Sequence, residues 1–173
     1  MSDTALANYF TPAGQEMLKR ELTHLWKVTR PEVTRKVAEA AAMGDRSENA
    51  EYIYGKRQLR EIDARVRYLS KRLDQLVVVD RKPDDLERIY FGAWVKLEDE
   101  AGELHVYRIV GSDEIEPRKG FISIDSPVAR ALLKKGRDEE VSAQGPEGEI
   151  TLHIVDISYE AFHENSSHED SGT

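Results

Sequence analysis

The sequence predicts an α+β fold, in which an N-terminal antiparallel α-helical coiled-coil hairpin precedes a small C-terminal antiparallel-sheet domain with one helix. In the first half of the chain, apolar residues recur at spacings of three and four, which is the period of a helix face. In the second half they form short runs separated by glycine-containing turns, which is typical of strands. The change falls at residues 81–85, a polar stretch around Pro83.

This pattern predicts five segments along the 173 residues. They are an N-terminal arm at 1–10, a coiled-coil hairpin at 11–80, a linker at 81–88, a sheet domain at 89–159 and a disordered polar tail at 160–173. The tail is predicted to be disordered because it holds few apolar residues and so has little surface to bury.

The composition restricts the class of protein. The chain has a net charge of -8 and no cysteine, so nothing indicates a disulfide framework or a thiolate metal site. It has no signal-like start and no run near the roughly 20 apolar residues that a membrane span needs. We therefore expect a soluble, cytoplasmic protein without a membrane partner, and we expect it to be monomeric.

The first long helix is expected to begin at Thr11-Pro12, because threonine is a good N-cap and proline suits the first helical position. Pro31 interrupts the pattern and allows either a kink or a fresh helical start. Gly44 is expected at the C′ position, just past the helix end. The apolar stripe moves by one position across Pro31, and its members are Leu18, Leu22, Leu25, Val33, Val37 and Ala40.

The second long helix carries a coiled-coil seam, with apolar residues at alternating spacings of three and four. The seam consists of Leu59, Ile62, Val66, Leu69, Leu73 and Leu76. Only a short turn separates the two apolar stripes, so the partner of this helix is the preceding one, in an antiparallel hairpin. Helices of roughly 30 residues would be on the order of 45 Å long, which places the turn at residues 44–52 at the far tip.

The second half is expected to form a small sheet. Strands are predicted at 90–97, 104–110, 121–124, 141–143 and 150–157. Ser126-Pro127 is expected to open one helix that runs through Leu133, by the same logic of cap followed by proline as at Thr11-Pro12. Trp94 is interpreted as a core residue or a surface aromatic of this domain, and the five histidines are scattered without metal-ligand spacing.

The turn at the tip admits two interpretations. In the first, Asp45 is the N-cap of the second helix and Glu48, three residues on, completes a capping box. In the second, Asp45, Glu48 and Glu51 gather carboxylates for Mg²⁺, which prefers oxygen ligands in octahedral geometry. Such a site would hold metal poorly alone, so a catalytic role requires a partner that supplies further ligands.

The second helix is basic within an acidic protein. Its cations are Lys56, Arg57, Arg60, Arg65, Arg67, Lys71 and Arg72, against only Glu61 and Asp63. Lys56, Arg60, Arg67 and Lys71 fall on one strip away from the seam, and the other three fall on the next strip round. The strip is either an ordinary solvated face or a contact for a polyanion such as single-stranded RNA or DNA, which would be salt-dependent.

Four separate stretches carry a family resemblance, in the expected order along residues 11–159. They are Gly44-Asp45-Arg46-Ser47-Glu48-Asn49-Ala50-Glu51-Tyr52, Leu25-Trp26 with Arg30-Pro31-Glu32-Val33-Thr34, Phe91-Gly92-Ala93-Trp94-Val95, and Ile122-Ser123-Ile124-Asp125-Ser126-Pro127 running into Ala131-Leu132-Leu133. With these motifs the sequence resembles the bacterial Gre-type transcript cleavage factors, and within them the GreB branch.

The resemblance implies a C-terminal domain of FKBP-like fold and a coiled coil that enters the secondary channel of RNA polymerase. There Asp45 and Glu48 would hold a second Mg²⁺ and its water beside the polymerase's own metal, next to the 3′ end of backtracked RNA. These two acids would be supported by the other residues of the tip, Arg46, Ser47, Asn49, Glu51 and Tyr52.

Two further surfaces take roles from the resemblance. Extruded RNA would be guided by Lys56, Arg57, Arg60, Arg67 and Lys71, and docking on the channel rim would use Asp125, Ser126 and Pro127. The chain would then be a cofactor of the polymerase's own hydrolysis and not an enzyme by itself. The alternative is a homologue that occupies the channel and modulates polymerase without promoting cleavage. A prolyl isomerase activity would be supported only by the FKBP-like fold, and a fold by itself does not imply an activity.

Overall fold

The computed structural model describes residues 6–45 and 48–163, so part of the predicted arm, Arg46 and Ser47 of the tip, and residues 164–173 of the predicted tail lie outside the described residues. The chain forms two compact units, Phe10–Val78 on one hand and Met1–Tyr9 with Val79–Thr173 on the other. Among the described residues, each helix is too short or too polar for a membrane span.

The helical unit starts as predicted. Helix α2 (Pro12–His24) has Thr11 as its N-cap, whose hydroxyl oxygen accepts a hydrogen bond from the Gly14 N–H at 3.1 Å, and proline follows at the first position. It runs through a π-helical turn, η1 (Leu25–Thr29), into α3 (Arg30–Ala42).

The π-helical turn explains the shifted apolar stripe. A π-helical turn adds one residue to an α-helix, so it rotates the following stripe by one position. The helix passes Pro31 in this way without a break, and Val33 and Ala40 return to the buried side. At the other end Met43 is the C-cap and Gly44 follows at C′ as predicted, but with a φ outside the left-handed region.

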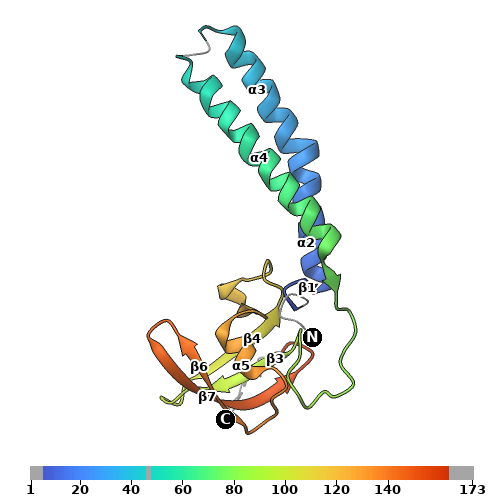
Figure 1. Ribbon diagram of the computed structural model, residues 1–173, viewed down its shortest axis with the longest axis vertical. Coiled ribbons are helices and arrows are strands. Elements are labelled where there is room, and N and C mark those ends of the chain that lie inside the picture. Colours follow the sequence, from blue (N-terminus) through green and yellow to red (C-terminus); the bar gives the residue numbers. More distant parts are fainter. Residues whose placement is uncertain (1–5, 46–47, 164–173) are drawn as a thin grey trace, which may run out of the picture. The chain divides into compact units, whose positions relative to one another are not determined.

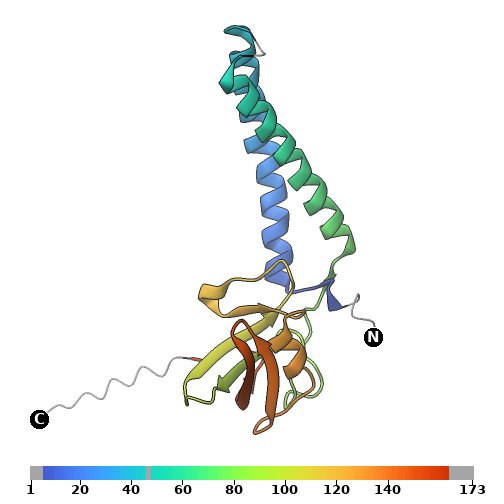
Figure 2. The same cartoon turned by 60° about the vertical axis from the view of Figure 1, so that its left-hand side comes forward.

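Helix α4 (Ala50–Gln75) lies antiparallel to α3, and the two are seen side by side in Figures 1 and 2. The predicted seam is confirmed, since Ile62 and Leu69 are buried and Leu69 is wholly inaccessible. Two ion pairs tie the helices across the seam, Arg30 Nε to Asp63 Oδ1 at 2.8 Å and Arg65 Nε to Glu21 Oε1 at 2.7 Å. A two-stranded sheet, β1 (Tyr9–Phe10) and β2 (Val77–Val78), is also present.

The second unit is built on a five-stranded sheet in the order β5-β4-β3-β7-β6. Its strands are β3 (Trp94–Glu98), β4 (Leu104–Val110), β5 (Phe121–Ser123), β6 (Glu140–Gly145) and β7 (Gly148–Ser158). The predicted fold class is confirmed, with one refinement: β5 pairs with β4 in parallel, whereas the other pairs are antiparallel. The connection from β4 to β5 is a crossover that contains a short 3₁₀ helix, η2 (Pro117–Lys119), and not a hairpin.

Helix α5 (Pro127–Leu132) packs against one face of this sheet, where Ala129 and Leu132 join a core with Val95, Leu97 and Ile109. Burial alternates along β3, so Trp94 and Lys96 lie on the opposite face. Of the predicted tail, Glu160 pairs with Lys82 at 2.9 Å, and Phe162 lies 5.1 Å below the Lys96 ammonium. The predicted core or surface position of Trp94 is thereby decided: it is a half-buried residue of the outer face.

Candidate functional site

The cap of α4 is Asn49 and not Asp45, so the predicted capping box is wrong. The helix begins at Ala50, and the Asn49 side-chain oxygen accepts a hydrogen bond from the Tyr52 N–H at 3.2 Å. The Asn49 amide nitrogen donates to the Ala40 carbonyl oxygen at 2.6 Å. The Asn49 side chain therefore joins the last turn of α3 to the first turn of α4. A capping contact within α4 alone would not connect the two helices.

The two predicted catalytic acids, Asp45 and Glu48, lie outside both helices. A backbone hydrogen bond from Glu48 N–H to the Asp45 carbonyl oxygen at 3.3 Å brings them into one turn, and both residues are exposed. Glu51 is exposed in the first turn of α4, where its negative charge interacts favourably with the positive end of the helix dipole. Because Asn49 is the N-cap of α4, neither Asp45 nor Glu48 is needed in that position.

The donor set of the tip suits a hard cation. Carboxylates are the oxygen ligands that Mg²⁺ uses in proteins, usually one or two at a time together with water and substrate phosphates. By residue type, Asp45 and Glu48 fit the oxygen ligands of Mg²⁺, while two carboxylates fall short of a complete octahedral shell.

Within the described part of the chain, the group that gathers three potential metal ligands lies elsewhere, at Asp99, Glu103 and His105. This group was not identified from the sequence. Asp99 and Glu103 stand at the two ends of a hairpin loop, and only the closed hairpin brings them together. Asp99 accepts hydrogen bonds from the N–H groups of Ala101 and Glu103, and its other oxygen lies 2.8 Å from His105 Nε2. The hydrogen bond from His105 is the main cause that lowers the pKa of Asp99. These contacts hold the loop between β3 and β4.

The role of Asn49 can be tested with two substitutions. We expect Asn49→Ala to lose about 1 kcal/mol of stability, a typical value for a lost cap, and to lower the Tm of the helical unit by about 4–8 °C. Asn49→Ser keeps a capping oxygen and is expected to lose less than half as much. Thermal unfolding followed by far-UV circular dichroism measures both. Equal Tm values for the two variants would contradict a capping role for Asn49.

The structure separates the basic residues of α4 into two groups. Arg65 forms a two-pronged contact with Glu21, with Nη2 to Oε2 at 3.0 Å, and Arg72 lies 5.1 Å from the Phe10 ring centroid. Both therefore serve the hairpin. The remaining cations are exposed, and they are the five predicted to guide RNA: Lys56, Arg57, Arg60, Arg67 and Lys71.

The exposed cations differ in their surroundings. Arg67 acts weakly on Asp63, whose pKa is lowered chiefly by the hydrogen bond from Arg30. The structure, over its described residues, gives no ion pair to Lys56, Arg57, Arg60 or Lys71. A face of unpaired cations on one side of the hairpin is thus available to a polyanion. This arrangement is compatible with the polyanion contact that was one of the two interpretations of the sequence.

Two of the three predicted docking residues, Asp125 and Ser126, form the loop before α5, and Pro127 is the first residue of that helix. Ser126 Oγ accepts a hydrogen bond from Ala129 N–H at 3.2 Å, so Ser126 is the N-cap that the sequence predicted, and exposed Pro127 follows it. Asp125 Oδ2 accepts from Ser112 Oγ at 2.8 Å, and its Oδ1 lies 3.8 Å from an Arg130 Nη2.

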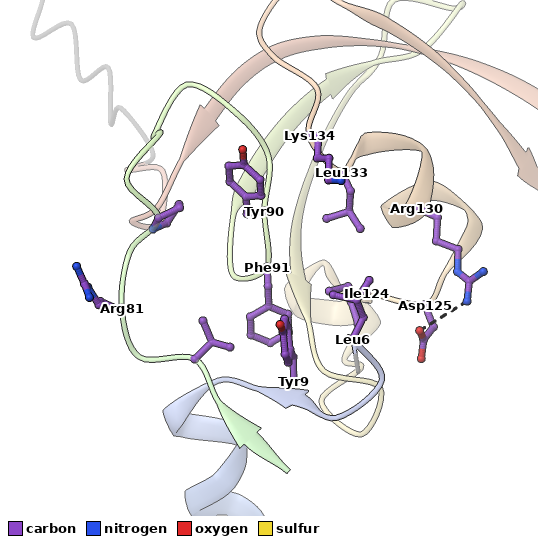
Figure 3. Close-up of a pocket in the computed structure, with 12 residues that line it drawn as sticks. Leu6, Tyr9, Arg81, Tyr90, Phe91, Ile124, Asp125, Arg130, Leu133 and Lys134 are labelled. Carbon is purple, nitrogen blue, oxygen red and sulfur yellow. Dashed lines mark ion pairs between the residues drawn. The ribbon is translucent and has the colours of Figure 1, made fainter. Parts of the chain in front are cut away.

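This loop borders a cavity of about 820 Å³ within the sheet unit, which sequence reasoning did not find (Figure 3). Its lining is largely apolar and comes from segments far apart in sequence, including Leu6, Tyr9, Phe91, Ile124 and Leu133. Tyr9 and Phe91 meet edge to face with centroids 5.6 Å apart. The Asp125–Arg130 pair lies at one side of this cavity.

Two family models match the chain. One is described as "Transcription elongation factor, N-terminal" and covers residues 8–78, and the other as "Transcription elongation factor, GreA/GreB, C-term" and covers residues 82–159. The chain is similar to proteins named transcription elongation factor GreB. That of Haemophilus ducreyi is 56% identical over 156 residues, with 90% of this chain and 96% of the relative covered. That of Pseudomonas aeruginosa is 58% identical over 156 residues, with 90% and 93% covered.

A solved structure, the crystal structure of GreA factor homolog 1 (Gfh1) of Thermus thermophilus, matches with 25% identity over 87% of this chain and 97% of that one, at a TM-score of 0.40.

Proposed function

The chain belongs to the GreA/GreB family of transcription elongation factors, and from that premise we propose that its tip stimulates cleavage of the RNA 3′ end in backtracked RNA polymerase. The observation that carries the proposal is that Asn49 caps α4, which leaves Asp45 and Glu48 exposed in the turn beyond both helices. Exposed carboxylates placed beyond the ends of both helices suit a site that is completed by another molecule.

In this proposal the hairpin reaches the active centre of polymerase through its secondary channel. Asp45 and Glu48 would hold a magnesium ion shared with the polymerase, and such an ion supplies an activated water and charge stabilisation at the leaving oxygen. Asn49 holds the turn that carries both acids, and Glu51 and Tyr52 extend it into α4. The chain acts as a cofactor of polymerase, and not as an enzyme by itself.

The sheet unit would dock on the rim of the channel through Asp125, Ser126 and Pro127. The support is geometric: Ser112 and Arg130 contact the Asp125 carboxylate and Ser126 caps α5, so contacts within the unit position this loop. We further propose that the protein works as a monomer in the cytoplasm, where transcription takes place in bacteria.

Cleavage of RNA in stalled complexes tests the function. Backtracked complexes with 3′-labelled RNA, given this protein and Mg²⁺, are expected to release short 3′ fragments faster than complexes without it. Release at the intrinsic rate together with tight polymerase binding would show a non-cleaving modulator instead. Release at the intrinsic rate without binding would reject the whole proposal.

The unpaired cations of α4 give a separate prediction. Replacing Lys56, Arg57 and Arg60 by Gln should weaken action on long extruded RNA more than on short, because only long RNA reaches along the helix. Loss of three phosphate contacts should make the salt dependence on long RNA shallower by about 2 in a log–log plot. The matched control replaces the exposed Lys19 and Lys27 of the first helix by Gln. Equal losses on long and short RNA would count against an RNA guide.

A further inference from the structure

Arg108 occupies an unusual position on the outer face of the sheet, away from α5. It lies opposite Trp94 on β3 and opposite Phe121 on β5. Its guanidinium carbon is 5.6 Å from the Trp94 ring centroid and 5.9 Å from that of Phe121. The two rings themselves meet edge to face, with centroids 5.8 Å apart. The guanidinium is therefore held between two aromatic side chains, an arrangement that favours a cation.

Two glycines build this arrangement. Gly92, at a φ of 85°, turns its carbonyl oxygen to accept a hydrogen bond from Arg108 Nε at 3.2 Å. Gly120, at a φ of 73°, brings the start of β5 close to β4, and a Cβ there would collide with the Val106 carbonyl oxygen. Within the Phe91-Gly92-Ala93-Trp94-Val95 motif, Gly92 and Trp94 thus contact Arg108, whereas Phe91, Ala93 and Val95 belong to the core.

The charge of Arg108 is only partly compensated. Burial is the main cause that lowers the pKa of this half-buried guanidinium, and Glu114 opposes it electrostatically. The Glu114 carboxylate accepts a hydrogen bond from Gly111 N–H at 2.7 Å. None of the described residues forms an ion pair with Arg108, and its hydrogen bond to Gly92 uses Nε alone. Both terminal nitrogens thus remain to bind an anion, in the planar geometry that matches a carboxylate.

The surroundings indicate a protein as the source of that anion. Val106, two residues before Arg108 on the same strand, is 40% exposed, and Ile115, in the crossover that precedes β5, is 53% exposed. Arginine with aromatic and aliphatic neighbours is the composition of an interface hot spot.

We propose that Arg108, held by Trp94 and Phe121, binds an aspartate or glutamate side chain on the surface of RNA polymerase, as a docking contact separate from residues 125–127. The polymerase as partner rests on the proposed function. A nucleic acid fits this face less well. Glu114 acts on Arg108, and Glu116 pairs at 3.3 Å with Lys119, whose ammonium lies 5.8 Å from the Phe121 ring centroid. A chain of phosphates would therefore meet a carboxylate beside each of these two cations.

Binding of the full-length protein to core RNA polymerase tests this contact. Arg108→Lys keeps the charge but loses the planar fork and the fit between the rings, and we expect about tenfold weaker binding. Arg108→Gln should lose at least as much, while Lys135→Gln, an exposed cation of the same unit, should change the Kd less than twofold. Thermal unfolding confirms that each variant is folded. Asp125→Ala with Pro127→Ala serves as the reference for loss of the other docking contact.

The outcomes separate this inference from the proposed function. Arg108→Lys should shift the concentration for half-maximal cleavage about tenfold and reach the wild-type rate at saturation. Wild-type Kd values for folded Arg108→Lys and Arg108→Gln would overturn the contact, whatever the cleavage assay shows. If the two Arg108 variants bound free single-stranded RNA more weakly but bound polymerase as the wild-type protein does, Arg108 would be a phosphate-binding residue. That result would also overturn the proposed contact with polymerase. If the wild-type protein released no RNA fragments, the polymerase titration would still decide the role of Arg108.

Discussion

Asp45→Asn and Glu48→Gln are each expected to slow RNA cleavage in backtracked complexes on the order of 100-fold or more, with little change in polymerase binding. Each substitution removes a negative ligand oxygen and keeps the size of the side chain. The metal ion in such a site contributes several kcal/mol of transition-state charge stabilisation, and each 1.4 kcal/mol is a factor of ten in rate. Loss of a negative ligand weakens the binding of that ion. Single-turnover cleavage at saturating protein measures the rate, and titration of polymerase measures the affinity.

The structure allows the metal-binding role of the two acids to be tested separately from the capping of α4. Asn49 caps α4, so the two acids can be neutralised without loss of the cap. We expect the Tm of both variants to stay near that of the wild-type protein, and raised Mg²⁺ to restore part of the rate. Glu61→Gln is the control, since Glu61 is an exposed carboxylate farther along α4, away from the tip. A large loss of polymerase affinity for Asp45→Asn would contradict a metal-binding role.

Gly55→Ala is expected to destabilise the helical hairpin, although alanine is the better helix former. A Cβ at residue 55 would lie 2.5 Å from Val37 Cγ2, so Val37 would have to move. The valine side chain is stiff in a helix, and overpacking costs about 1–3 kcal/mol, against about 1 kcal/mol gained in helix propensity. We expect a net loss of about 1 kcal/mol and a Tm lower by about 4–8 °C, measured by far-UV circular dichroism.

The same substitution in a Val37→Ala background gives the control. There the added methyl group has room, so Gly55→Ala should stabilise the hairpin by the propensity difference alone, about 1 kcal/mol. The sign of the effect therefore reverses between the two backgrounds, which a double-mutant cycle measures as a coupling between the two residues. Equal destabilisation in both backgrounds would show that close packing against Val37 is not the reason for glycine at position 55.

Much of the hairpin could be predicted because its signals are local. The stripe from Leu59 to Leu76 gives a helix period, and the caps Thr11 and Ser126 act within three residues of their own position. The sequence also predicted a displaced stripe around Pro31, and the π-helical turn at Leu25–Thr29 supplies its cause. The seam extends to Gly55, four residues before Leu59, which pattern reasoning missed because glycine is not read as apolar.

At the tip, the capping box that the sequence offered as one interpretation is wrong, because Asn49 and not Asp45 is the N-cap of α4. Asp45 and Asn49 are comparable N-caps by residue type, so local preference could not choose between them. The choice depends on the Ala40 carbonyl oxygen, nine residues back, which accepts a hydrogen bond from the Asn49 amide nitrogen. A carboxylate has no such donor.

By itself the sequence determined two units, the helical seam, the acid-rich tip and the basic face, because these follow from periodicity and charge along continuous segments. Only the tertiary structure decided which arginines of α4 remain unpaired, how β5 pairs with β4 in parallel, and how Arg108 comes to lie between Trp94 and Phe121. Each of these depends on a partner more than ten residues away. Such partners meet only when the hairpin closes and the strands take their register.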